Sequence, residues 1–217
     1  MNMTALDVKD YLRTGIFLDI ESTLSGEIRE IAYIYRDERI IATTAQERER
    51  VVSRLNVLAR EAAFIGGHNI LWHDLPILAD KGKCPELQRL PVLDTLLLSP
   101  LAFPQKPYHP LIKNDKLVTA SRSNPLNDAD ASQLIAEEAL EALGGRLAAD
   151  WPFIAAFLSA GNLPDTARAG IRMISRLIGT EAISGKEAVS RFVSRFGERF
   201  CGEGMQRLMN GTSGVDV

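Results

Sequence analysis

The chain has 217 residues, of which 46% are hydrophobic and 24% are charged, the composition of an ordinary soluble globular protein. Its net charge of −3 excludes a protein that binds nucleic acid through overall charge, so a polyanion would need a local basic face and a metal at an acidic centre. No apolar run reaches membrane-spanning length, the N-terminus lacks a signal-peptide core, and the two cysteines lie far apart, so we expect a cytoplasmic protein without a cysteine zinc site.

The first part of the chain alternates predicted strands and helices. The apolar pattern predicts strands at 15–20, 28–36, 39–44, 64–67 and 91–95, and helices at 46–62, 74–81, 96–101 and 126–143. Three strands come first, and helices separate the remaining strands. This order predicts an α/β fold with hairpin strands at one edge of the sheet.

The remainder of the chain has only helical patterns, at 151–159, 165–179 and 184–200. We therefore expect a first domain at 1–145, a helical extension at 146–201 and a disordered, Gly-rich tail at 202–217. Basic residues recur at near-helical spacing in the extension. A solvated face is the expected explanation, and a face that guides a nucleic acid strand is the alternative. These residues are Arg168, Arg172, Arg176, Lys186, Arg191, Arg195 and Arg199.

The most informative motif is the pair Asp19 and Glu21, which follows the apolar run 16–18. Residues i and i+2 of a strand point to the same face, so both carboxylates project together from the end of a core strand. Carboxylates held that close raise each other's pKa, and a divalent cation such as Mg²⁺ removes the conflict. The alternative is a strand that ends in solvent and happens to carry two acids.

Two further acids lie where helices are predicted to begin. Asp74 comes a few residues after the segment Gly66-Gly67-His68-Asn69, and Asp128 opens the helix 126–143. An acid at such a position also stabilises a helix by capping and by its dipole, worth about 1 kcal/mol, so each could be purely structural. We expect His68 to stabilise the turn and His73 to support Asp74 or cap the helix.

Together these segments resemble the DEDD superfamily of 3′–5′ exonucleases, which have an RNase H-like fold. Asp19 and Glu21 match the first motif, His68-Asn69 with Asp74 matches the second, and Asp128-Ala129 matches the last acid of the third. The resemblance covers about residues 14–143.

A narrower resemblance is to the exonuclease modules at the N-terminus of some bacterial RecQ-like helicases. The residues that carry it are Leu97–Pro104, Tyr108-His109, Lys113, Lys116-Leu117 and Asn124–Ala129. It implies a helicase fused to, or associated with, the chain.

The general base of the family is absent from its usual place. The histidine branch has it five residues before the last acid, where this chain has Ser123, and the tyrosine branch has it four residues before, where Asn124 stands. His109 is either the base on a long loop with Asp128 as the last ligand, which we favour, or the partner of Asp115 in an expanded motif. A loop histidine without a catalytic role is the third alternative.

The resemblance implies an RNase H-like mixed β-sheet flanked by helices and hydrolysis of phosphodiester bonds at the 3′ end of DNA, single-stranded or frayed. The hydrolysis would use two ions, Mg²⁺ or Mn²⁺, held roughly 3.5–4 Å apart. The alternatives are an exoribonuclease, since the acids do not read the sugar, and a catalytically weak module that binds nucleic acid or a helicase. No membrane partner is expected.

The expected site residues form three groups. The metal ligands are Asp19, Glu21, Asp74 and Asp128; the base is His109; the substrate-binding residues are Ser22, Thr23, Asn69, Lys113 and Lys116. Trp72, Phe103 and Tyr108 are candidates for stacking on bases, although for Trp72 we favour packing in the core or a loop.

Overall fold

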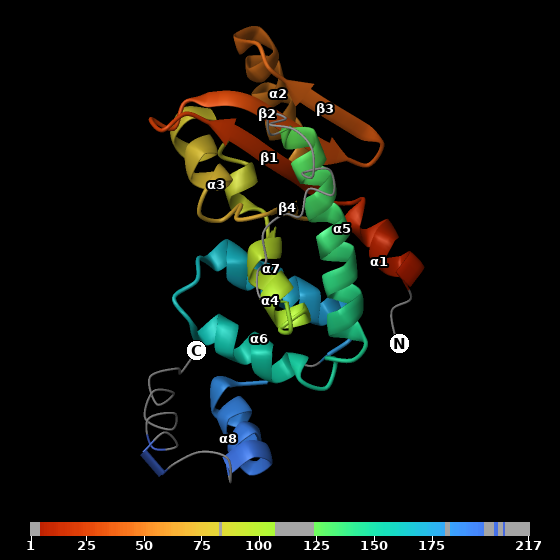
Figure 1. Cartoon of the computed structure of the whole chain (residues 1–217), viewed down its shortest axis with the longest axis vertical. Helices are drawn as coiled ribbons and strands as arrows, with labels where there is room; N and C mark the ends of the chain where they lie inside the picture. The colour runs from red at the N-terminus through yellow and green to blue at the C-terminus, as the bar shows by residue number, and fades with distance from the viewer. Residues whose placement is uncertain are drawn as a thin grey trace.

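The computed structural model describes residues 5–82, 84–106, 124–180, 183–197, 202–203 and 206. The chain has an α/β fold with a mixed five-stranded sheet, in the order β3-β2-β1-β4-β5, flanked by helices (Figure 1). The strands are β1 (Ile16–Ser22), β2 (Ile28–Tyr35), β3 (Glu38–Ala42), β4 (Ile65–Gly67) and β5 (Val92–Asp94). β1 is central, because it pairs antiparallel with β2 on one side and parallel with β4 on the other.

Helices connect and cover these strands. They are α1 (Ala5–Leu12), α2 (Ala45–Leu58), α3 (Asp74–Ile77), α4 (Thr95–Ala102), α5 (Pro125–Gly144), α6 (Trp151–Ala160), α7 (Asp165–Leu177) and α8 (Gly185–Phe196). A π-helix, η1 (Leu78–Gly82), continues α3, and a 3₁₀ turn, η2 (Leu87–Arg89), precedes β5. Each predicted strand is present within a few residues, whereas α1 and η2 were not predicted, and the helix expected at 74–81 divides into α3 and η1.

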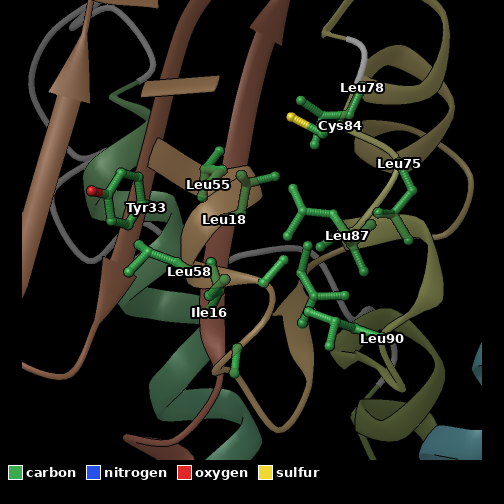
Figure 2. Close-up of a cluster of buried hydrophobic side chains, with 14 of the residues drawn as sticks. Ile16, Leu18, Tyr33, Leu55, Leu58, Leu75, Leu78, Cys84, Leu87 and Leu90 are labelled. Atoms are coloured by element: carbon green, nitrogen blue, oxygen red, sulfur yellow. The ribbon is translucent and has the colours of Figure 1, made fainter. Parts of the chain in front are cut away.

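One face of the sheet packs against α2 and the chain that follows α3. Because successive strand residues point to opposite faces, Ile16 and Leu18 of β1 lie on this side with Tyr33 of β2. These side chains belong to one buried cluster with Leu55 and Leu58 of α2, which Figure 2 shows. The alternation expected from the sequence therefore builds the first hydrophobic core.

The opposite face packs against α1, α5 and the C-terminal helices. Phe17 of β1 lies opposite Ile34 of β2, and both join a second cluster with Leu140 of α5. Trp151 and Ile174, from α6 and α7, belong to the same cluster. Since Asp19 and Glu21 follow Phe17 at intervals of two residues, they lie on this face, which α5 covers.

The edge strand β5 is in close contact with α7. A Cβ atom on Gly170 would lie 1.9 Å from the carbonyl oxygen of Val92, so the two backbones meet at this point. Within the described residues, no helix is both long and apolar enough to cross a membrane.

Candidate metal-binding site

Three carboxylates meet at the C-terminal end of β1. Oxygen atoms of Asp19, Glu21 and Asp128 all lie within 4.8 Å of one another. Asp19 and Glu21 come from β1, and Asp128 lies in the first turn of α5, where Asn124 caps the helix by accepting the N–H of Leu126 at 3.0 Å. Asp128 is buried, and the other two acids are half-buried. The fold thus brings together three of the four acids expected from the sequence.

The fourth acid, Asp74, reaches β1 from the side of β4. β4 pairs with β1 at Ile16 and Phe17 and then turns away, which leaves the N–H of Ile20 beyond the last pair. The Oδ1 atom of Asp74 accepts this N–H at 2.7 Å, and the residue is 1% exposed. Asp74 therefore takes the place of a neighbouring strand at this point, close to Asp19 but outside the group of three.

The electrostatics of the site centre on Asp19. Burial, followed by the negative charges of Asp74, Asp128 and Glu21, raises the pKa of Asp19 to about 8, and His73 opposes the shift. Burial also raises the pKa of the Asp74 carboxyl above its usual range. Crowded carboxylates of this kind are stabilised by a divalent cation, whose preferred ligands are carboxylate oxygens. The donor set therefore fits Mg²⁺ or Mn²⁺.

His73 lies between Asp74 and the hairpin that β1 forms with β2. Its Nδ1 atom is 3.5 Å from Oδ2 of Asp74, and its Nε2 atom is 3.5 Å from the hydroxyl of Ser22. The contact with Asp74 is the main cause that raises the pKa of His73. His73 is thus placed to support Asp74, one of the two roles that the sequence suggested for it.

An open hollow of about 710 Å³ adjoins this end of β1. Ser22, Thr23, Leu24 and Arg29 line it from the hairpin, and His73 and Ile77 line it from α3. Ser22 and Thr23 were expected to bind substrate, whereas Arg29 was not singled out. Its place in the hollow depends on the pairing of β1 with β2, which no local sequence signal reveals.

Asn69 has a backbone role in the turn that precedes Asp74. Its φ angle of 62° lies in the left-handed region, and its N–H donates to Oδ1 of Asp94 at 2.9 Å. The interaction of its side chain with substrate stays a prediction. Asp94, the buried acceptor, is a residue that sequence reasoning missed, although an acid between a strand and a helix is a recognisable N-cap signal.

Several expected residues lie outside the described part of the chain: Tyr108, His109, Lys113, Asp115, Lys116 and Arg199. Of the aromatic candidates, Trp72 is 58% exposed, so of the two expected alternatives packing in the core is wrong, while packing in a loop and stacking on a base stay predictions. Phe103 is half-buried at the end of α4 remote from Asp94, with Nζ of Lys106 4.1 Å above its ring.

Three of the basic residues of the extension form ion pairs at the surface, as expected for a solvated face, and the alternative of a face that guides nucleic acid stays a prediction. Arg168 pairs with Asp165, Arg191 with Glu187 and Arg195 with Asp150 at the surface. Such exposed pairs contribute about 0–1 kcal/mol each to stability.

The chain was compared with protein-family models, with curated proteins and with solved structures, and none of them matches it. The fold and the site geometry define an α/β protein with an acidic centre at the end of its central strand.

Proposed function

We propose that the protein is a metal-dependent 3′–5′ exonuclease of RNase H-like fold that hydrolyses phosphodiester bonds at the 3′ end of DNA. The observation that carries this proposal is the approach of the Asp19, Glu21 and Asp128 carboxylates to within 4.8 Å, with Asp74 beside them. A mixed sheet flanked by helices is also the plan that the resemblance to DEDD exonucleases implies.

The four acids would hold two Mg²⁺ or Mn²⁺ ions. When bound, such ions activate a water molecule, orient the phosphate and neutralise the charge that develops during hydrolysis. The negative charges of Asp74, Asp128 and Glu21 all act on Asp19, so bound cations would stabilise the ionised form of its carboxyl. Asp74 would be fixed in place by its bond to the Ile20 N–H and by His73.

The hollow beside the acids would take the terminal nucleotide. The hydroxyls of Ser22 and Thr23 can donate to sugar or phosphate oxygens, and the guanidinium of Arg29 can pair with a phosphate. His109 remains the proposed general base, which would take a proton from the attacking water. An exonuclease that removes residues from one end needs such a pocket next to its reacting centre.

The test uses a 5′-labelled oligonucleotide with Mg²⁺ or Mn²⁺. We expect a ladder that shortens from the 3′ end, is abolished by a chelator and is lost in Asp19→Asn. Asp128→Asn should reduce the rate at least about 100-fold, because it removes a metal ligand from the charged site. Asp130→Asn is the matched control: it changes an acid of the same helix that pairs with Arg39 instead, and it should keep near wild-type activity.

The outcomes separate the alternatives. A faster ladder on RNA than on DNA would move the substrate to RNA. The absence of a ladder on both substrates with both metals would contradict the enzyme and leave a module that binds nucleic acid or a helicase. Equal activity in Asp128→Asn and Asp130→Asn would contradict the assignment of Asp128.

His109→Ala tests the base separately. We expect about a 100-fold or greater loss of rate with little change in metal affinity, because a general base acts on the water and not on the ions. Mg²⁺ affinity by calorimetry and the rate of ladder formation measure the two effects. Full activity in this variant would exclude His109 as the base.

A further inference from the structure

Asp94 is a buried carboxylate at the end of β5 that the proposed mechanism does not use. It is 3% exposed, yet both of its oxygen atoms accept hydrogen bonds. Oδ1 accepts the N–H of Asn69 and the N–H of Leu96, each at 2.9 Å, and Oδ2 accepts the N–H of Leu71 at 3.1 Å. The Leu96 bond caps α4, whereas the other two bonds hold a turn on a different part of the chain.

That turn, residues 68–73, connects β4 to Asp74. Asn69 adopts a left-handed φ of 62°, a conformation that is uncommon outside glycine and that asparagine tolerates better than most residues. The carbonyl oxygen of Asn69 accepts the N–H groups of Trp72 at 3.2 Å and of His73 at 3.0 Å. The backbone of Asn69 thus holds His73, the residue that precedes Asp74.

The residue after Asp94 contacts the start of the same turn. The hydroxyl of Thr95 donates to the carbonyl oxygen of Gly67 at 3.2 Å and lies 2.9 Å from Nδ1 of His68. Asp94 and Thr95 together therefore hold the chain from Gly67 to Leu71 against the end of β5. At the far end of the turn, the carboxylate of Asp74 meets the N–H of Ile20.

We propose that Asp94 is a positioning residue that holds the 68–73 turn and thereby sets the Asp74 carboxylate against β1 at the acidic site. Its carboxylate accepts two amide N–H groups of the turn and one of α4. An asparagine side chain of the same size cannot accept all three, because its NH₂ group would face an N–H group. The consequence for metal binding rests on the proposed function, whereas the placement of Asp74 does not.

Two variants separate the turn from the helix cap. Asp94→Asn keeps the size of the side chain but places a donor against at least one amide. Asp94→Ser keeps an N-cap for α4, since serine is among the best capping residues, but its side chain is too short to accept the N–H groups of Asn69 and Leu71 as well. Thr44→Ala is the control, because it also removes a helix N-cap, but the Thr44 side chain caps α2 by accepting the N–H of Glu47 and not an amide of the 68–73 turn.

The first measurement is amide hydrogen exchange in metal-free protein. The N–H of Ile20 reports the position of Asp74 directly. We expect it to exchange at least about tenfold faster in Asp94→Asn and Asp94→Ser than in the wild type, while the amides of β2 keep their protection. Wild-type exchange at Ile20 in both variants would overturn the proposal, as would equal acceleration in Thr44→Ala.

The second measurement is Mg²⁺ affinity by calorimetry. Residues that hold metal ligands in place change affinity about 10–100-fold when they are replaced, so we expect at least a tenfold loss in both Asp94 variants and less than a twofold change in Thr44→Ala. Unchanged affinity despite faster exchange at Ile20 would contradict the role of Asp94 in the site. If the wild type binds no Mg²⁺ but Ile20 responds, the metal site fails and the positioning of Asp74 stands.

Discussion

At the scale of single residues, Asp19 lies among several other acids. Its carboxyl is surrounded by three other acids, and its pKa is raised to about 8 by burial and by their charges. An acid whose pKa rises on folding is protonated more easily in the folded state, so the folded state loses stability as the pH rises from about 4 to 8. Such a cost is typical of a site built for a ligand.

The first prediction concerns the pH dependence of metal binding. Because the pKa of Asp19 is about 8, a cation at pH 6 or 7 must displace its proton. We expect Mg²⁺ affinity to rise by up to about tenfold per pH unit below pH 8 and to level off above it. Calorimetry between pH 6 and 9 measures this. Constant affinity over that range would show that Asp19 is already ionised at pH 6.

The second prediction concerns stability without metal. Asp19→Asn removes the group whose ionisation opposes folding, so at pH 8 the variant should unfold at a temperature about 3 °C or more above the wild type. At pH 4, where Asp19 is protonated in the folded state, the difference should be small. Thermal unfolding in a chelating buffer measures both values, and a lower midpoint for Asp19→Asn at pH 8 would contradict the raised pKa.

The residues of the site differ in how far the sequence could reveal them. Asp19 and Glu21 were accessible because strand alternation fixes their common face, and Asp128 was accessible because it opens an amphipathic helix. Asp94 was recognisable only as an N-cap, and its bonds to the turn were not, because those amides lie more than twenty residues earlier in the chain. Arg29 was missed for a similar reason, since only the β1–β2 pairing brings it to the hollow.

At the scale of elements, the strands were the most predictable part. Their apolar residues alternate or form short runs, and these patterns arise from burial on one face or on both. The helix α1 was missed because it is short and depends on tertiary contacts for its stability. One of them is the stacking of Tyr11 on Phe64, with ring centroids 5.6 Å apart. The capping box of α2, in which Thr44 and Glu47 bond each other's backbone, is by contrast a local signal.

The third prediction tests the contact between α7 and β5. Alanine favours a helix interior by about 1 kcal/mol over glycine, so Gly170→Ala would stabilise α7 if space allowed. The Cβ atom, however, would lie 1.9 Å from the carbonyl oxygen of Val92, so we expect a net loss of about 2 kcal/mol in the free energy of unfolding.

Chemical denaturation compares this variant with Gly144→Ala. At Gly144 the nearest atom to a new Cβ is a side-chain carbon of Ile178 at 3.2 Å, which can shift, so we expect a change of less than about 1 kcal/mol. Stabilisation by Gly170→Ala would mean that α7 does not rest on β5.

At the scale of the whole molecule, the sheet separates two hydrophobic clusters. The second cluster joins Phe17 and Leu93 of the sheet to Trp151 and Ile174 of the C-terminal helices. The boundary predicted at residue 145 stays a prediction, but this shared cluster indicates that the two parts stabilise each other. The sequence predicted the order of the elements, whereas the contact between distant helices and the sheet depends on side-chain packing that no local pattern encodes.

The arrangement of the sheet explains why the acids meet. β1, β4 and β5 run parallel, so their C-terminal ends lie along the same edge of the sheet, across the strands. Asp19 and Glu21, the turn that leads to Asp74, and the start of α4 at Asp94 all lie along this edge, and α5 brings Asp128 to it. The site is therefore a product of topology, which places short motifs from separate segments next to one another.

The most direct test is a crystal structure with Mn²⁺ and a nucleoside monophosphate, in which anomalous scattering locates the ions. We expect two Mn²⁺ peaks bound by carboxylate oxygens of Asp19, Glu21, Asp74 and Asp128, with the nucleotide in the hollow beside Ser22. Crystals with no Mn²⁺ at these four acids, or with Mn²⁺ only at other positions, would contradict the central claim that the four acids form a metal-binding catalytic site.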